Sequence, residues 1–265
     1  MSDTKAFHYG SGLFYKHDVT EAPPEDIFSV HTHTAYELLY FVGGDASYII
    51  ENNKYKLTKG DLVIVRPMSY HLVKIDSPID YERYDILFDE RDIGKDFVDL
   101  IPEGVEVVNL SKNRVADGIF KRLDYYRAAL DGEGFARMLP MLIKELILNL
   151  SLGNAGSLAE FSAGNETVSA ALGIINENLF TIEGIGEVAK KLFVSESYLY
   201  RIFKREMFST PKKYINDKRL LAAREMIRIG ESPLLASERC GYRDYSAFYR
   251  AYVKFFGHSP TEDRR

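Results

Sequence analysis

The chain contains a single cysteine, Cys240, so no disulfide can form within it. It also lacks any run of about 18 apolar residues, the length that a membrane-spanning helix needs. The segment from Met1 to Lys5 does not start the apolar stretch of a secretory signal. We therefore expect a cytoplasmic protein that has no membrane partner.

The composition has no extreme that would indicate a disordered chain. Hydrophobic residues make up 46% and charged residues 28% of the 265 residues, which are enough for two domains with separate cores. The charges are unevenly divided. Residues 169–265 contain 17 Lys and Arg and 12 Asp and Glu, a net charge of +5, whereas the other 168 residues have a net charge of −10. This division indicates affinity for phosphate at one end only.

A ten-residue pattern near the C-terminus occurs twice, at residues 195–204 and, 49 positions later, at residues 244–253. Each copy begins with a residue that can cap a helix, Ser195 or Asp244. Apolar residues then recur at i, i+3 and i+4, which predicts a helix with one face toward a core and a polar, cationic face toward solvent. A short predicted helix precedes each copy, and residues 214–229 are a candidate connecting helix. The pattern predicts two helix-turn-helix units.

These units resemble the DNA-binding domain of the AraC/XylS family of transcription regulators. The resemblance covers residues 168–264 and rests on three motifs in the family's order. They are Leu-Tyr-Arg-x-Phe-Lys from Leu199, Arg-Leu-Leu-Ala-Ala-Arg from Arg219, and Gly-Tyr-x-Asp-x-Ser-x-Phe from Gly241, followed by Phe-Gly-x-Ser-Pro. The resemblance implies a sequence-specific regulator whose partners are double-stranded DNA and RNA polymerase.

The family pattern also implies which side chains meet DNA. Arg201 and Arg250 are the strongest candidates to contact guanine, because a guanidinium can bridge its O6 and N7 atoms. Lysines at the rim suit phosphate instead. The alternative is that either arginine braces its own unit through an internal carboxylate. The implied DNA-binding residues are Ser197, Tyr200, Arg201, Lys204, Lys212, Tyr245, Ser246, Tyr249 and Arg250.

Three features depart from the family pattern. Phe208 occupies the position of a glycine that permits a left-handed turn, so we expect a different exit from the first recognition helix. Gly184 and Gly186 in the first supporting helix predict a less stable unit. Asp263 replaces an aromatic residue, so we expect the last turn to fray.

The first hundred residues are typical of short antiparallel strands separated by Gly, Asn, Asp or Pro turns, which favours a sandwich or barrel. The expected strands are residues 37–42, 46–51, 54–57, 61–66, 71–75 and 81–88. If residues 31–37 are extended, His31, His33 and Glu37 share one face. A neighbouring strand adds His71. This spacing resembles the two cupin motifs, although Arg66 and Met68 occupy positions usually held by Pro and Gly.

Three imidazoles and a carboxylate are a plausible ligand set for Zn, Mn, Fe or Ni. Sensors of the AraC/XylS family often keep such a His-x-His-x3-Glu pattern while binding an organic effector. The resemblance therefore implies that the sensor binds a small molecule, such as a sugar or a related metabolite, and no cofactor. A divalent metal bound by His31, His33, Glu37 and His71 is the alternative. A further alternative is a plain scaffold in which Glu37 pairs with Arg66 or Arg83. The candidate effector-binding residues are His31, His33, Glu37, Arg66 and His71.

Between residues 115 and 152 the apolar residues recur at helical spacing in two runs, separated by residues 131–134, which predicts an antiparallel helix pair. Family helices of this kind carry dimerisation, which implies a homodimer. The alternative is a helix that packs only on its own barrel. The residues to which the resemblance assigns the dimer contact are Leu139, Ile143, Ile147 and Leu150.

The sequence therefore predicts an α+β protein in three parts. Residues 1–152 form a cupin-like antiparallel β-barrel with a helical pair at about 113–152, residues 153–167 form a flexible linker, and residues 168–265 form an all-α domain with two helix-turn-helix units. We expect no catalytic residues and a regulator whose sensor controls promoter binding. The competing functions are a metal-dependent cupin enzyme with a DNA-binding tail and a ligand-independent regulator.

Overall fold

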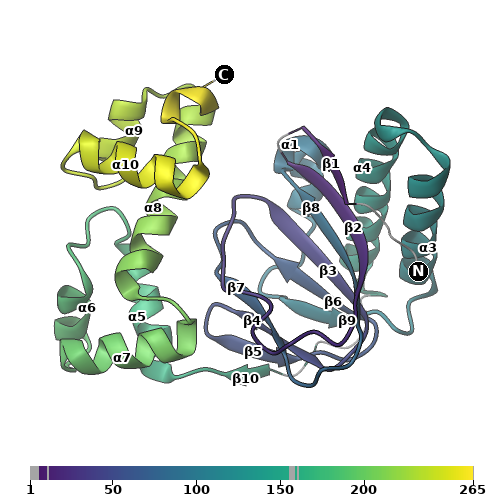
Figure 1. Ribbon diagram of the computed structural model, residues 1–265, viewed down its shortest axis with the longest axis horizontal. Coiled ribbons are helices and arrows are strands. Elements are labelled where there is room, and N and C mark those ends of the chain that lie inside the picture. Colours follow the sequence, from purple (N-terminus) through teal and green to yellow (C-terminus); the bar gives the residue numbers. More distant parts are fainter. Residues whose placement is uncertain (1–5, 11, 155–158, 160, 265) are drawn as a thin grey trace. The chain divides into compact units, whose positions relative to one another are not determined.

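The computed structural model describes residues 6–10, 12–154, 159 and 161–264, and the chain divides into two units, Met1–Ser162 and Ala163–Arg265. The first unit combines antiparallel strands with a helical pair, and the second is helical (Figure 1). This architecture confirms the predicted α+β fold class. Among the described residues, no helix is both long and apolar enough to cross a membrane.

Among the described residues, the strands of the first unit form two separate sheets. The larger sheet has the order β1 (Phe7–Tyr9), β2 (Leu13–Thr20), β8 (Tyr81–Phe88), β3 (Tyr36–Gly43), β6 (Asp61–Val65) and β9 (Val107–Asn109). The smaller sheet has the order β10 (Phe161–Ala163), β5 (Asn53–Lys56), β4 (Ala46–Ile50) and β7 (His71–Ile75).

Alternation along the strands divides the apolar residues between two cores. One core lies between the sheets and contains Leu39 and Phe41 of β3 and Tyr48 of β4. The other lies on the outer face of the larger sheet, where Leu38 and its neighbours pack against helices. The six expected strands are present, but the sequence analysis did not predict β1, β2, β9 and β10.

Helices α3 (Arg114–Ala129) and α4 (Gly132–Asn149) cover the outer face of the larger sheet, and the short helices α1 (Glu90–Ile93) and α2 (Lys95–Val98) pack beside α4 (Figure 1). Asn113 and Asp131 cap the two long helices through their side chains. A π-helical turn, η1 (Leu150–Asn154), follows α4.

The residues assigned to a dimer contact lie inside this core. Leu139, Ile143, Ile147 and Leu150 are each at most 2% exposed. Their side chains pack against the chain's own sheet, so the prediction that they contact a second protomer is wrong. The exposed large apolar residues of the helix pair are Val115, Tyr125, Met141 and Leu148.

The second unit contains α5 (Glu166–Glu177), α6 (Ile185–Lys191), α7 (Glu196–Met207), α8 (Pro211–Arg228), α9 (Pro233–Arg239), α10 (Tyr245–Phe256) and the 3-10 turn η2 (Pro260–Asp263). Ser195 and Asp244 cap α7 and α10 as predicted, because their side chains accept hydrogen bonds from first-turn amides. The expected connecting helix is present as α8.

The segment expected to be a linker is partly structured. It includes strand β10, and its last residues, Glu166 and Thr167, already belong to α5, which Asn165 caps. Residues 155–158 and 160 of the expected linker lie outside the described residues.

Two of the expected departures turn out differently. Phe208 has φ 51° at the end of α7, so the left-handed turn is kept and a phenylalanine adopts it. Asp263 does not leave the last turn frayed. It accepts hydrogen bonds from Arg224, at 3.1 Å, and from the Tyr252 hydroxyl, at 2.6 Å, which fasten η2 to α8 and α10. Gly184 precedes α6 and only Gly186 lies within it.

Candidate functional site

The first candidate site consists of the exposed polar faces of α7 and α10. Leu199, Ile202 and Phe203 are buried beneath α7, and Phe248 and Tyr252 beneath α10. The opposite faces are exposed. The predicted residues that lie there are Ser197, Tyr200, Arg201 and Lys204 on α7, Lys212 at the start of α8, and Ser246, Tyr249 and Arg250 on α10.

Tyr245 differs from the other predicted DNA-binding residues. It is half-buried, and its ring packs against Phe248, with ring centroids 5.8 Å apart. Tyr245 therefore supports the core of the second helix-turn-helix unit and also lies near the polar face of α10.

Neither Arg201 nor Arg250 forms an ion pair within 4 Å among the described residues. The Arg201 guanidinium lies 5.9 Å from the centre of the Tyr198 ring. This arrangement argues against the alternative in which each arginine braces its unit through a carboxylate. The neighbouring Arg205, in contrast, is paired with Glu206 at 2.6 Å.

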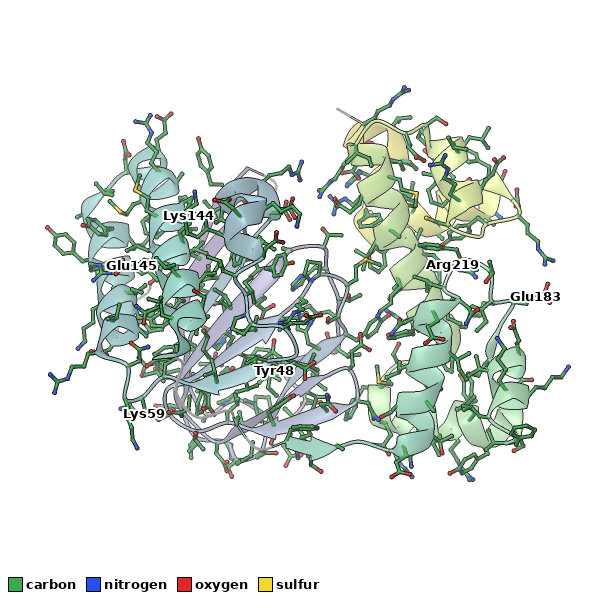
Figure 2. The ribbon with its side chains drawn as sticks, turned by 180° about the vertical axis from the view of Figure 1, so that it is seen from behind. Tyr48, Lys59, Lys144, Glu145, Glu183 and Arg219 are labelled. Atoms are coloured by element: carbon green, nitrogen blue, oxygen red, sulfur yellow. The ribbon has the colours of Figure 1, made fainter. Side chains whose placement is uncertain are left out.

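Arg219 of α8 connects the two helix-turn-helix units. The guanidinium of Arg219 (Figure 2) donates to the backbone carbonyls of Leu179, at 2.8 Å, and Ile182, at 2.7 Å, just before α6. It also donates to the carbonyl of Gly241, at 3.3 Å, in the second helix-turn-helix unit. Gly241 is tightly enclosed, because a Cβ there would lie 2.2 Å from the carbonyl oxygen of Phe180. The arginine thus ties α8 to the loop between α5 and α6 and to the turn between α9 and α10.

The second candidate site lies at one end of the two sheets of the first unit. His31 precedes β3 and pairs with His71 of β7 through two backbone hydrogen bonds of 3.1 and 3.0 Å. The Met68 amide donates to the carbonyl of His33 at 2.7 Å, and Met68 adopts φ 65°, as a glycine readily would. These contacts hold the two cupin-like segments together. Residues 32–35 are not a strand, contrary to the expectation of an extended segment.

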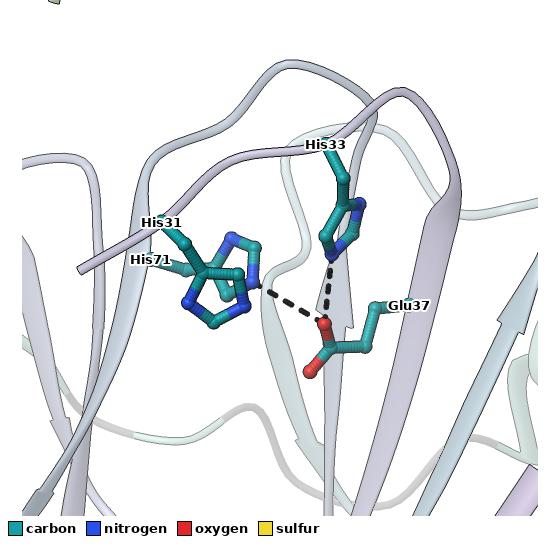
Figure 3. Close-up of side chains that lie close together, drawn as sticks. All are labelled: His31, His33, Glu37 and His71. Carbon is teal, nitrogen blue, oxygen red and sulfur yellow. Dashed lines mark hydrogen bonds and ion pairs between the residues drawn. The ribbon is translucent and has the colours of Figure 1, made fainter. Parts of the chain in front are cut away.

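Four of the five predicted effector-binding side chains converge there. The Nε2 atoms of His33 and His71 lie 3.0 and 3.2 Å from the same Oε2 atom of Glu37 (Figure 3). His31 stacks edge-on against His71, with ring centroids 4.1 Å apart. The other carboxylate oxygen, Oε1, accepts a hydrogen bond of 2.9 Å from Tyr48. Glu37 and His71 are buried, while His31 is exposed at the mouth of the cluster.

The contacts in this cluster perturb its titration. Burial disfavours the Glu37 carboxylate, but hydrogen bonds with His33 and His71 outweigh burial and hold the pKa of Glu37 well below its usual range. Burial also opposes the charged form of His71, yet contact with Glu37 raises the pKa of His71. Burial and the nearby His71 lower the pKa of His31.

Arg66 does not join the cluster. Its guanidinium donates to the backbone carbonyls of Val105 at 3.0 Å and Pro102 at 2.5 Å. The reason is strand alternation: Val65 faces the core between the sheets, so the next side chain leaves on the other side. Arg66 therefore braces a loop and lies apart from the four clustered side chains, contrary to its predicted place in the effector site. Glu37 pairs with neither Arg66 nor Arg83.

A second polar group, which was not predicted from the sequence, lies on strands β2 and β8 of the larger sheet. Arg83 pairs with Asp18 at 2.8 Å and with Asp85 at 3.1 Å. Burial raises the pKa of Asp85 to about 7, although Arg83 opposes this shift. The parity of residues 81, 83 and 85 could have indicated this face, but the unpredicted strand β2 supplies Asp18.

Comparison with known proteins gives two family matches. Residues 15–97 match the AraC-like ligand binding domain, and residues 188–265 match a helix-turn-helix domain. Together they cover more than half of the chain, and each contains one of the two candidate sites.

Individual relatives agree with these matches. The transcriptional activator RhaS of Citrobacter koseri is 25% identical over 256 residues, covering 91% of this chain and 89% of that protein. The probable transcriptional regulator LumQ of Photobacterium leiognathi is 32% identical over 88 residues, covering 33% of this chain and 36% of that protein. Among solved structures, ToxT of Vibrio cholerae aligns over 95% of this chain and 97% of that one with 10% identity and a TM-score of 0.39.

Two recognition helices presented by a helix-turn-helix domain, joined in one chain to an AraC-like ligand-binding domain, define a single architecture. The chain belongs to the AraC family and is a transcription regulator with an N-terminal ligand-binding domain and a C-terminal DNA-binding domain.

Proposed function

We propose that α7 and α10 read DNA bases through the exposed residues predicted from the sequence, and that a small molecule bound near Glu37 controls this binding. The observation that carries the first part is that Arg201 and Arg250, on the exposed faces of two capped helices, form no ion pair with the residues that the structure describes. A free guanidinium on a recognition helix is suited to the O6 and N7 atoms of guanine.

The cations near these helices have different roles in this proposal. Lys204 and Lys212 are exposed at the edges of the polar face and contact phosphate, so they contribute affinity but little sequence preference. Because α7 and α10 both pack against α8, they enter successive major grooves about one helical turn apart.

The effector site is formed by His31, His33, Glu37 and His71, with Tyr48 behind the carboxylate. These side chains lie within the segment that matches the ligand-binding domain, which supports the proposal. They act in binding and not in catalysis, because the relatives are transcription regulators. A second copy of the chain, contacted through the exposed face of α3 and α4, and RNA polymerase at the promoter complete the proposed partners.

The experiment compares two single variants on a set of operator sequences. Arg201→Ala is expected to relax the preference at one base pair by about 1 to 3 kcal/mol, because it removes a base contact. Lys212→Ala is expected to weaken binding to every sequence by a similar factor and to reduce the salt slope by about 1. Binding is measured by fluorescence anisotropy at several salt concentrations.

Arg205→Ala is the matched control, because Arg205 lies on the same helix but is already paired with Glu206. A uniform loss of affinity across all operator variants for Arg201→Ala would show that this side chain contacts no base.

A further inference from the structure

The orientation of the three histidine rings in the sensor leaves one kind of atom pointing inward. Each Nδ1 atom lies 3.0 Å from a backbone carbonyl oxygen, that of Ser29 for His31, Ala35 for His33 and Ser69 for His71. A carbonyl only accepts hydrogen bonds, so each Nδ1 must carry a proton. In the neutral ring the lone pair is then on Nε2, the arrangement found in histidines that bind metal ions.

Two of these lone pairs face an acceptor instead of a hydrogen-bond donor. The Nε2 atoms of His33 and His71 both face the Oε2 atom of Glu37, which as a carboxylate also only accepts. The Nε2 atom of His71 is buried and has no well-aligned hydrogen bond among the described residues.

One cation would satisfy all four side chains. A ligand atom from each of His31, His33, Glu37 and His71 lies within 4.8 Å of the others. Two ligands bound to the same ion at about 2.1 Å lie roughly 3.0 to 3.4 Å apart, and the two contacts between histidine and Glu37 have this spacing, 3.0 and 3.2 Å. The backbone bridge between His31 and His71 already holds two of the rings side by side (Figure 3).

We infer that the Nε2 atoms of His31, His33 and His71 and the Glu37 carboxylate bind one first-row divalent transition-metal ion, with Tyr48 as the hydrogen-bond partner that orients the carboxylate. Nitrogen-rich sets of this kind favour Zn²⁺, Mn²⁺, Fe²⁺ or Ni²⁺ over Mg²⁺ or Ca²⁺. This inference deepens the proposed effector site, because it uses the same four residues, but it does not depend on DNA binding.

The test uses the full chain after removal of metal with a chelator. Zn²⁺, Mn²⁺ and Ni²⁺ are titrated separately in a calorimeter, and Co²⁺ is added as a spectroscopic probe. We expect one ion per chain and visible Co²⁺ absorption typical of nitrogen and oxygen ligands. His31→Ala and Glu37→Gln are each expected to weaken binding at least about 100-fold, because each removes a metal ligand.

Two features keep the test interpretable. His31 is exposed, so its truncation leaves the core intact, and near-ultraviolet circular dichroism checks that both variants are folded. His8→Ala is the matched control, since His8 is an exposed histidine outside the cluster and should leave binding unchanged.

Equal binding by the wild type and by folded His31→Ala, or the absence of one-to-one binding for every ion, would overturn the inference. DNA binding is measured on the same samples. If no ion binds while the chain still binds its operator and responds to an organic effector, the metal site is disproved and the proposed function stands.

Discussion

At the residue scale, three described residues with large apolar side chains adopt the left-handed backbone conformation that glycine adopts most easily. They are Met68 in the sensor, with φ 65°, and Phe193 and Phe208 in the first helix-turn-helix unit, with φ 55° and 51°. In the second helix-turn-helix unit the equivalent turns contain Gly241, at φ 82°, and Gly257, at φ 80°. The two units thus share a turn geometry, and only the first bears the strain of a Cβ atom.

Replacing Phe193 with glycine is therefore expected to stabilise the DNA-binding domain. Phe193 is 96% exposed, so its removal loses little packing, while relief of the left-handed strain should raise the free energy of unfolding by about 1 kcal/mol. The midpoint of urea unfolding measures the change.

Gly257→Ala provides the reverse comparison. No heavy atom lies within 4 Å of the position that a Cβ would occupy, so any loss of stability, which we expect to be about 1 kcal/mol, comes from the backbone alone. If both substitutions leave the midpoint unchanged, backbone strain is not stored at these turns.

At the scale of elements, a partly buried polar cluster fastens α3 to the larger sheet. Asp124 of α3 accepts hydrogen bonds of 2.7 Å from the hydroxyls of Tyr15 and Tyr84, and both of its oxygens lie 3.1 Å from Nδ1 of His17. The other ring nitrogen of His17 lies 3.0 Å from Glu82. A histidine between two carboxylates is best satisfied when it is charged.

Stability of the sensor is expected to depend on pH through this cluster. Burial opposes the charge on His17, but hydrogen bonds with Asp124 and Glu82 outweigh it and raise the pKa of His17. A raised pKa contributes stability that is complete below the unfolded value of about 6.5 and is lost as the pH rises through the folded value. His17→Gln should therefore cost more stability at about pH 6 than at about pH 8, as measured by urea unfolding.

His8→Gln controls for the loss of a histidine, because the His8 ring lies beside Phe14 and has no carboxylate partner among the described residues. An equal cost of His17→Gln at both pH values would mean that the charged form of His17 does not hold α3 in place.

At the scale of the whole molecule, the two units have separate cores and opposite charges. The first unit buries its apolar residues between and outside its sheets, and the second buries a cluster around Leu220 and Phe248. The last 97 residues have a net charge of +5 and the rest of the chain −10, so attraction to phosphate is confined to the second unit.

Thermal unfolding of the full chain is expected to show two transitions, because each unit has its own core. Zn²⁺ should shift only the transition of the first unit upward, by an amount that grows with its free concentration, and operator DNA should shift only the other. Differential scanning calorimetry distinguishes these cases. A single transition that both ligands shift equally would show that the units unfold as one.

The DNA-binding domain could be predicted in detail because its evidence is local. Caps, apolar spacing and the exposed arginines all lie within a few turns of helix, and the structure places Ser195, Asp244, Arg201 and Arg250 as expected. The sensor was predicted less completely. Strand β2 was not predicted, because its pairing with β8 joins residues far apart in the chain. Arg66 was assigned to the wrong side of its strand, although the alternation after Val65 places it on the other face.

The amino-acid sequence by itself determined the two recognition helices, the alternation of the strands and the division of charge, since each depends on the chemical order of neighbouring residues. Only the tertiary structure decided that Arg66 stays outside the cluster of His31, Glu37 and His71, that α4 buries its apolar face within its own chain, and that phenylalanines take left-handed turns. The physical reason is that these outcomes depend on the burial of a complete core, which outweighs the local preference of any single residue.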